Sequence, residues 1–308
     1  MEFGPMDERD RTERCEGGVE VDVEPAGVPV RKLLTFCPPV YVQRYQAVLG
    51  LVRQYQPQAV VDLGCGECRL LQQLRWEPCI ERLAGVDVDR NVLTGNRQGL
   101  QPLIADFLRP RAHPLKVHLF QGSVAIRDPR MVGYDFATCL ELIEHLDSDV
   151  LHELPGMLFG HMAPHIVIVT TPNADFNELI PGLVGFRHWD HRFEWTRREF
   201  QNWGEYVDKE YGYGVTFSGV GQGPPGTESY GFCTQIAVFK RRGGPPLIPL
   251  YTTLAGLDLP YDMVAEITYP DQGGKIELHN PRKQHRRKKR GTRHCGRAAS
   301  AHHDKPSP

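Results

Sequence analysis

Three potential metal ligands lie close together, just after a short apolar segment. The run from Cys139 to Leu146 reads C-L-E-L-I-E-H-L and contains Glu141, Glu144 and His145. In a helical turn, side chains spaced three and four residues apart lie on one face. Two carboxylates in one place repel each other unless a cation or a proton intervenes, which favours a metal site. Acids at the start of a helix can instead stabilise its dipole, so this pattern alone leaves both interpretations open.

A second polar and aromatic segment lies further along the chain. Residues 186–196 read F-R-H-W-D-H-R-F-E-W-T and follow a predicted strand, so this loop should return to the same edge of the sheet. It offers His191 or His188 as a fourth ligand, although a lone loop histidine is more often a surface residue. Two Glu with two His form a mixed set of hard and borderline ligands, which suits Mg²⁺, Mn²⁺, Co²⁺ or Fe²⁺ better than a structural zinc.

A glycine turn after the first predicted strand indicates a nucleoside-containing cofactor. The sequence V-V-D-L-G-C-G-E at residues 60–67 contains Asp62, Gly64 and Gly66, and glycine allows both a tight turn and a close approach of a ligand. Asp87 ends the second predicted strand, where a carboxylate can accept hydrogen bonds from both hydroxyls of a ribose. Ser123 follows the third, a position suited to the edge of an adenine. A leucine occupies the place of the third glycine of the dinucleotide fingerprint, which counts against NAD.

These candidate residues require a sheet that brings the strand ends together. The chain alternates short β-branched runs with helical patterns, which predicts a Rossmann-like α/β fold with helices on both faces. Its sheet should be mainly parallel and seven-stranded, with an antiparallel hairpin at one edge. The strands are expected at 59–63, 83–88, 117–120, 134–139, 165–170, 215–220 and 233–239, and the helices at 40–54, 68–75, 90–97, 148–159 and 196–211.

Composition predicts one main domain with different ends. We expect a flexible arm at 1–30, the α/β domain at 31–242 and a mostly disordered basic tail at 243–308. Residues 282–297 hold nine Lys and Arg and no acid, so the formal net charge of -2 leaves -11 for the rest. Such an acidic body cannot hold a long nucleic acid by general phosphate attraction. Eight irregularly spaced cysteines and the lack of a long apolar run predict a soluble intracellular protein, with no part in a membrane.

The cofactor motifs resemble those of the S-adenosylmethionine-dependent methyltransferases, over about residues 58–240. Other motifs make the resemblance narrower: E-L-I-E-H-L, T-P-N at 171–173, D-H-R-F-E-W-T-R-x-E-F at 190–200, F-C-P-P-V-x-x-Q-R-Y at 36–45 and G-F-C-T-Q at 231–235. Together they are similar to the small-RNA 2′-O-methyltransferases of the Hua-enhancer type. The resemblance implies that Glu141, Glu144, His145 and His191 hold one divalent metal. It further implies cofactor contacts by Gly64, Asp87 and Ser123, with Asp62 and Gly66 in the same loop, and RNA contacts by Gln43, Arg44 and Arg187.

The implied activity is metal-dependent transfer of a methyl group from S-adenosylmethionine to the 2′-hydroxyl of the 3′-terminal nucleotide of a small RNA. His145 or His191 would take the proton. The resemblance is to the shorter animal form, which acts on single-stranded piRNAs, so the expected partner is a Piwi-class Argonaute and the expected location is the cytoplasm, in germ-cell ribonucleoprotein granules. Two alternatives are a metal-dependent methyltransferase of a small vicinal diol such as a catechol, and a non-catalytic scaffold.

Overall fold

The computed structural model describes residues 34–243 and 258–273. The predicted arm at 1–30, and the parts of the predicted tail at 244–257 and 274–308, lie outside these residues. The helices are α1 (Val40–Tyr55), α2 (Arg69–Leu74), α3 (Arg90–Asn96), α4 (Ile104–Leu108), α5 (Ser148–Pro155) and α6 (Arg197–Tyr211). The strands are β1 (Ala59–Leu63), β2 (Arg82–Asp87), β3 (Leu115–Gln121), β4 (Phe136–Leu140), β5 (Ile166–Pro172), β6 (Tyr213–Gln222), β7 (Phe232–Arg241) and β8 (Asp262–Tyr269).

The eight strands form one sheet in the order β6-β7-β5-β4-β1-β2-β3-β8. Strands β1 to β5 pair in parallel with one another, whereas β7 pairs antiparallel with both β5 and β6, and β8 pairs antiparallel with β3. The strands that follow β1 are added on one side of it as far as β3, and β4 and β5 are then added on the other side. The adjacent strands β1 and β4 therefore mark the switch point of the sheet, and α/β folds bind ligands in the crevice at the carboxyl ends of such strands. This arrangement confirms the predicted Rossmann-like class and its antiparallel hairpin.

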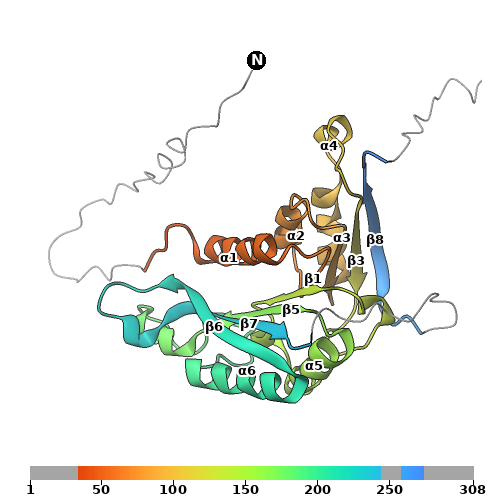
Figure 1. Cartoon of the computed structure of the whole chain (residues 1–308). Coiled ribbons are helices and arrows are strands. Elements are labelled where there is room, and N and C mark those ends of the chain that lie inside the picture. The colour runs from red at the N-terminus through yellow and green to blue at the C-terminus, as the bar shows by residue number, and fades with distance from the viewer. Residues whose placement is uncertain (1–33, 244–257, 274–308) are drawn as a thin grey trace, which may run out of the picture. The chain divides into compact units, whose positions relative to one another are not determined.

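Alternate residues of the central strands supply two separate cores. Val61 and Leu63 of β1 pack on one side, in a cluster with residues of α5 and α6, whereas Val60 packs on the other side with residues of α1 and α2. Figure 1 shows α1, α2 and α3 on one side of the sheet and α5 and α6 on the other. A strand that is buried on both faces is apolar at nearly every position, and four of the five buried residues of β1 are apolar, the exception being Asp62. Polar side chains that could bind a ligand or react with it therefore lie mainly at the ends of such strands.

The strand count is the main correction to the predicted fold. The seven predicted strands are present, with ends within two residues of those expected, but β8 adds an eighth at the β3 edge. It lies inside the region predicted to be mostly disordered. Pairing of β8 with β3 joins residues 141 to 154 positions apart along the chain, and such a non-local ladder has no local sequence signal. The short helix α4 was also not expected.

The residue before β8 supports the cofactor side of the sheet. Tyr261 is buried, and its hydroxyl lies 2.9 Å from the carbonyl oxygens of both Ser123 and Ile126. Its ring occupies the place that a Cβ on Gly122 would take, at 2.2 Å from the nearest ring atom. Gly122 therefore has no side chain because Tyr261 closes against it. In this way the late strand holds the turn after β3.

None of the helices in the described part of the chain is both long and apolar enough to cross a membrane.

Candidate active site

Two cavities open at the carboxyl edge of the parallel strands. The first has a volume of about 180 Å³ and lies beside the ends of β1, β2 and β3. Gly64, Asp87 and Ser123 line it, as the sequence predicted for cofactor contacts, together with Val88, Gly122, Val124, Leu142, His145, Leu146, Asp147 and Val150.

The loop after β1 has the conformation that its glycines allow. Gly64 and Gly66 have φ values of 71° and 48°, in the left-handed region that side chains disfavour. A Cβ on Gly64 would also lie 2.7 Å from the Leu142 side chain, which would have to move to make room for it. The carboxylate of Asp87 accepts hydrogen bonds from the backbone N–H groups of Gly66 at 2.8 Å and Asp89 at 2.9 Å. Asp87 thus shapes the turn and also presents its carboxylate to the cavity.

Asp62 lies beneath this loop and not in the cavity wall. Its side chain is buried and accepts a hydrogen bond from the Thr138 hydroxyl at 2.6 Å. Burial raises the pKa of Asp62 to about 7, against the effect of the Thr138 hydrogen bond, and the nearby Asp87 carboxylate adds to the increase. Asp62 therefore joins β1 to β4 through Thr138, and its predicted contact with the cofactor stays a prediction.

The second cavity, of about 500 Å³, holds the acidic and histidine residues. Glu141, Glu144, His145 and His191 all line it, as predicted, although they come from two segments more than 40 residues apart. The remaining lining residues are Val40, Tyr41, Arg44, Pro172, Arg187, His188, Cys233 and Thr234. The four predicted ligands thus line one cavity, but in the described part of the chain the group whose ligand atoms lie within 4.8 Å of one another is His145, His188 and His191.

The three ligands after β4 do not lie on a regular helix. Glu141 has a φ of 48°, and the segment that follows forms only a short 3₁₀ turn, Ile143–His145. The helical geometry considered for this motif is therefore wrong, although the convergence of the side chains is not. Glu141 Oε1 instead accepts a hydrogen bond from the Thr170 hydroxyl at 2.9 Å, which ties the motif to β5.

The two carboxylates differ in their surroundings. Glu141 Oε2 lies 2.9 Å from the guanidinium of Arg44, with 23% of its side chain exposed. Glu144 is fully buried; one oxygen accepts a hydrogen bond from Thr171 at 3.0 Å, and the other, Oε1, is buried without a hydrogen-bond partner. Burial, and then the neighbouring Glu141 carboxylate, raise the pKa of Glu144 well above its ordinary value. An unpartnered buried oxygen beside a second carboxylate is the arrangement that a divalent cation satisfies.

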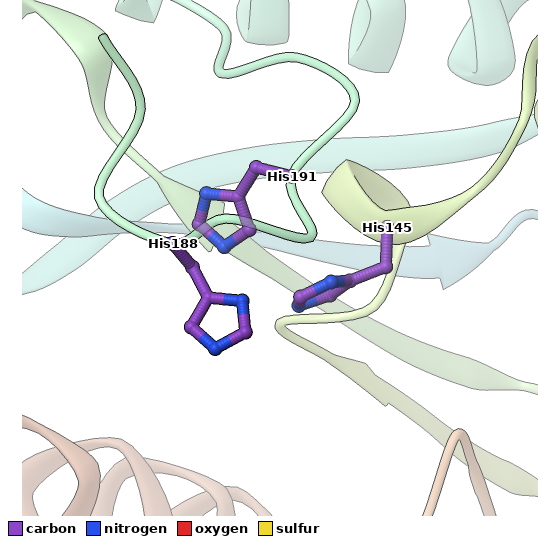
Figure 2. Close-up of side chains that lie close together, drawn as sticks. All are labelled: His145, His188 and His191. Carbon is purple, nitrogen blue, oxygen red and sulfur yellow. The ribbon is translucent and has the colours of Figure 1, made fainter.

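Three histidines complete the cavity. The ligand nitrogens of His145, His188 and His191 lie within 4.8 Å of one another, and Figure 2 shows the three rings facing one another across a common space. His188, which the sequence offered only as an alternative to His191, belongs to this group. Burial and the adjacent His191 lower the pKa of His145, although Asp190 acts in the opposite direction. His145 is therefore neutral at pH 7, with a lone pair available to a metal or a proton.

His145 lines both cavities. A group placed in the first cavity and a group placed in the second therefore meet at this side chain. The cavity beside the glycine loop and the cavity of acidic and histidine residues are therefore adjacent.

The three predicted RNA contacts have different surroundings. Arg44 and Arg187 line the second cavity, whereas Gln43 does not. Gln43 instead connects the start of α1 to β6, with Nε2 donating to the Pro38 carbonyl and Oε1 accepting from the N–H of Gly221. The Arg187 guanidinium donates to the carbonyl oxygens of Cys233 and Asn173. The proposed contacts of these side chains with RNA remain predictions.

Sequence reasoning missed Glu194 and Tyr261. Glu194 lies inside the aromatic motif, and its carboxylate accepts a hydrogen bond from His191 Nδ1 at 2.5 Å. Its spacing of three residues from His191 was the available signal. Tyr261 had none, because it reaches the cofactor edge only through the pairing of β8.

Comparison with known proteins agrees with this geometry. A family model described as a methyltransferase domain matches residues 41–214. The small RNA 2′-O-methyltransferase of Gallus gallus is 50% identical over 210 residues, which cover 68% of this chain and 56% of that protein. The chain thus spans about half the length of the curated relatives that it matches.

Two solved structures resemble the chain in both fold and sequence. The methyltransferase domain of bacterial CtHen1-CN is 37% identical with a TM-score of 0.56, and the match covers 65% of this chain and 99% of that one. The small RNA methyltransferase HEN1 is 30% identical with a TM-score of 0.64, and the match covers 80% of this chain and 30% of that one. The chain belongs to the S-adenosylmethionine-dependent methyltransferases, within the group of the small RNA 2′-O-methyltransferases.

Proposed function

We propose that this chain transfers a methyl group from S-adenosylmethionine to the 2′-hydroxyl of the 3′-terminal nucleotide of small single-stranded RNAs such as piRNAs. The observation that carries this proposal is the position of His145 between the cofactor cavity and the cavity of ligands. A nucleophile held among those ligands would lie beside a methyl donor held by the glycine loop. Placement of this kind can supply most of the catalysis for a methyl transfer.

The names of the relatives favour RNA, and the ligand set favours its terminus. Glu141, Glu144, His145 and His191 form a mixed oxygen and nitrogen set suited to Mg²⁺, Mn²⁺ or Co²⁺. Such a set suits a substrate with two adjacent oxygens, and in RNA only the 3′-terminal ribose has a free 2′,3′-diol. An internal ribose has its 3′-oxygen in a phosphodiester. Selectivity for the terminus would follow from this chemistry without any reading of bases.

Each residue then has a definite task. Bound S-adenosylmethionine supplies the electrophilic methyl group, and a bound divalent ion supplies a Lewis acid that lowers the proton affinity of the ribose hydroxyl. Asp87 would hold the cofactor ribose, and Arg44 would shift from Glu141 to compensate charge elsewhere in the cavity. A histidine can accept the proton only at a ring nitrogen that does not bind the metal, so one of His145 and His191 would act as the base and the other as a ligand.

The negative net charge of the chain outside residues 282–297 favours delivery of the RNA by a partner. Outside residues 282–297 the chain carries a formal net charge of -11, so phosphate attraction alone would bind RNA weakly. A Piwi-class Argonaute that presents the 3′ end is the partner we propose, with the cytoplasm and its germ-cell granules as the location. Pull-down of the protein with such an Argonaute, with and without its RNA, would test this part.

A single substrate series tests the activity. Synthetic single-stranded RNA of one sequence is prepared with a 2′,3′-diol, a 2′-deoxy, a 3′-deoxy or a 3′-phosphate terminus, and radiolabelled methyl transfer is measured with Mg²⁺, Mn²⁺ or Co²⁺ and with chelator. We expect methylation of the diol alone, and only with metal. Equal methylation of the 3′-deoxy RNA would contradict the role of the diol. Transfer to a catechol but to none of the RNAs would favour the small-molecule alternative.

A further inference from the structure

Glu194 is a buried carboxylate whose oxygens are both occupied. Only 1% of its side chain is exposed. Oε2 accepts a hydrogen bond from Asn177 Nδ2 at 2.6 Å, and Oε1 accepts one from the backbone N–H of Arg187 at 2.6 Å and lies 2.5 Å from His191 Nδ1. Each oxygen therefore faces an N–H donor, so the geometry uses Glu194 as a hydrogen-bond acceptor.

An acceptor at Nδ1 determines the tautomer of His191. A neutral imidazole carries one proton, and the nitrogen that faces a carboxylate must be the one that donates. In the neutral form of His191, Nε2 is therefore the nitrogen that carries the lone pair. In Figure 2 one ring nitrogen of His191 faces the space shared with His145 and His188, while Nδ1 is the atom engaged by Glu194.

His145 has a looser version of the same contact. Its Nδ1 lies 3.3 Å from Asp190 Oδ2, and the Asp190 side chain is 37% exposed. His188 differs, because its Nδ1 accepts a hydrogen bond from the backbone N–H of Asp190 at 3.2 Å. The buried pair of Glu194 and His191 is therefore the tightest carboxylate–imidazole contact around the cavity.

We propose that Glu194 is a positioning residue that holds His191 as the Nδ1-protonated tautomer and aims its Nε2 lone pair into the ligand cavity. The use of that lone pair as a metal ligand rests on the function proposed above. Carboxylates in this position orient metal-binding histidines and increase their basicity, and their loss typically weakens metal binding by about 10- to 100-fold.

Hydrogen bonds to neighbouring segments hold Glu194 in place. Asn177 belongs to the 3₁₀ turn Ala174–Leu179 that follows β5, and the Arg187 guanidinium donates to the carbonyl oxygens of Asn173 and Cys233 at the ends of β5 and β7. Arg187 Nε also donates to Asn177 Oδ1. The loop that carries His191 is thus attached to two strand ends through the same groups that surround Glu194. A structural role for Arg187 follows from the same contacts.

The first measurement uses the unaltered full chain without metal. Histidine labelled with ¹⁵N distinguishes protonated from unprotonated ring nitrogens by chemical shift, and the spectrum of His191→Gln assigns the signals of His191. We expect a protonated Nδ1 and an unprotonated Nε2. A protonated Nε2 in the folded wild type would overturn the proposal, and this result requires no Glu194 variant to fold.

The second measurement compares Glu194→Gln with Glu199→Gln by Mn²⁺ calorimetry and thermal unfolding. Glu199 is a matched control, because its carboxylate accepts two hydrogen bonds from Thr196 at the start of α6, away from the cavity. We expect Mn²⁺ affinity to fall by about 10- to 100-fold in Glu194→Gln and to change by less than about twofold in Glu199→Gln.

The outcomes separate the two proposals. If the wild type binds Mn²⁺ and Glu194→Gln binds it equally well, Glu194 has no positioning role. If the wild type fails to bind Mn²⁺, the proposed metal site is wrong, while the ring-nitrogen spectrum still decides whether Glu194 sets the tautomer. A fall in affinity together with a change in the His191 tautomer supports the proposal.

Discussion

Neutralising either of the two cavity glutamates should have the same effect on metal binding but opposite effects on stability. Glu144→Gln removes a fully buried charge whose Oε1 has no hydrogen-bond partner, while the Thr171 hydroxyl can still donate to the amide oxygen. Without metal, replacing such a charge by a neutral group of equal size should increase the free energy of unfolding by about 1–3 kcal/mol. For a domain of this size, that corresponds to a rise in Tm of roughly 2–10 °C.

Glu141→Gln removes a charge that is already compensated. Glu141 lies 2.9 Å from Arg44 with 23% of its side chain exposed, so this partly exposed ion pair contributes about 0.5–1 kcal/mol after solvent screening. Its loss should lower the free energy of unfolding by that amount. Mn²⁺ binding should weaken strongly in both variants, because each replaces one of two anionic oxygen ligands by a neutral amide oxygen.

The assay is thermal and urea unfolding in excess chelator at pH 8, with Mn²⁺ calorimetry on the same preparations. At this pH the wild type has the largest cost for burying Glu144 as an anion. A Glu144→Gln protein that is less stable than the wild type in chelator would refute the argument that this carboxylate is placed for a cation. Unchanged Mn²⁺ binding in either variant would remove that residue from the ligand set.

Three further predictions concern the cofactor side. Asp87→Ala should weaken S-adenosylmethionine binding by at least about tenfold, because it removes a charged acceptor of the ribose hydroxyls, and should leave Mn²⁺ affinity nearly unchanged; calorimetry with each ligand checks both. The pKa of Asp62 is raised from 3.8 to about 7, so the folded state holds a proton that the unfolded chain releases, and the stability this contributes is present below pH 4 and lost as the pH rises to 7. Asp62→Asn should remove this part of the pH dependence, up to about 1.4 kcal/mol per pH unit, and identical slopes of unfolding free energy against pH would contradict the assignment. Tyr261→Ala should lower both stability and cofactor affinity through the turn at Ser123, whereas a sequence-based boundary at 242 would predict no effect on either; unfolding and cofactor titrations distinguish the two.

Much of the site was readable from local sequence. The glycine turn at Gly64 and Gly66 and the acid at Asp87 are consequences of strand-to-helix chemistry over a few residues, so their types and spacing reveal them. The E-L-I-E-H run also indicates a functional site, because two carboxylates close together at a strand end repel each other unless a cation or a proton intervenes. Its conformation was not readable: the left-handed φ of Glu141 and the short 3₁₀ turn depend on the contact with Thr170, which lies on another strand.

The amino-acid sequence by itself determined the alternation of strands and helices, because burial on both faces requires continuous apolar strands and amphipathic helices whatever the neighbours are. It also determined which residue types stand at the strand ends. Only the tertiary structure decided that His145 lies between two cavities, that Glu194 faces Nδ1 of His191, and that β8 completes the sheet and places Tyr261 beneath the cofactor turn. Each of these depends on pairing or packing between distant segments, and the free energy of such contacts depends on burial and geometry that no short window of sequence contains.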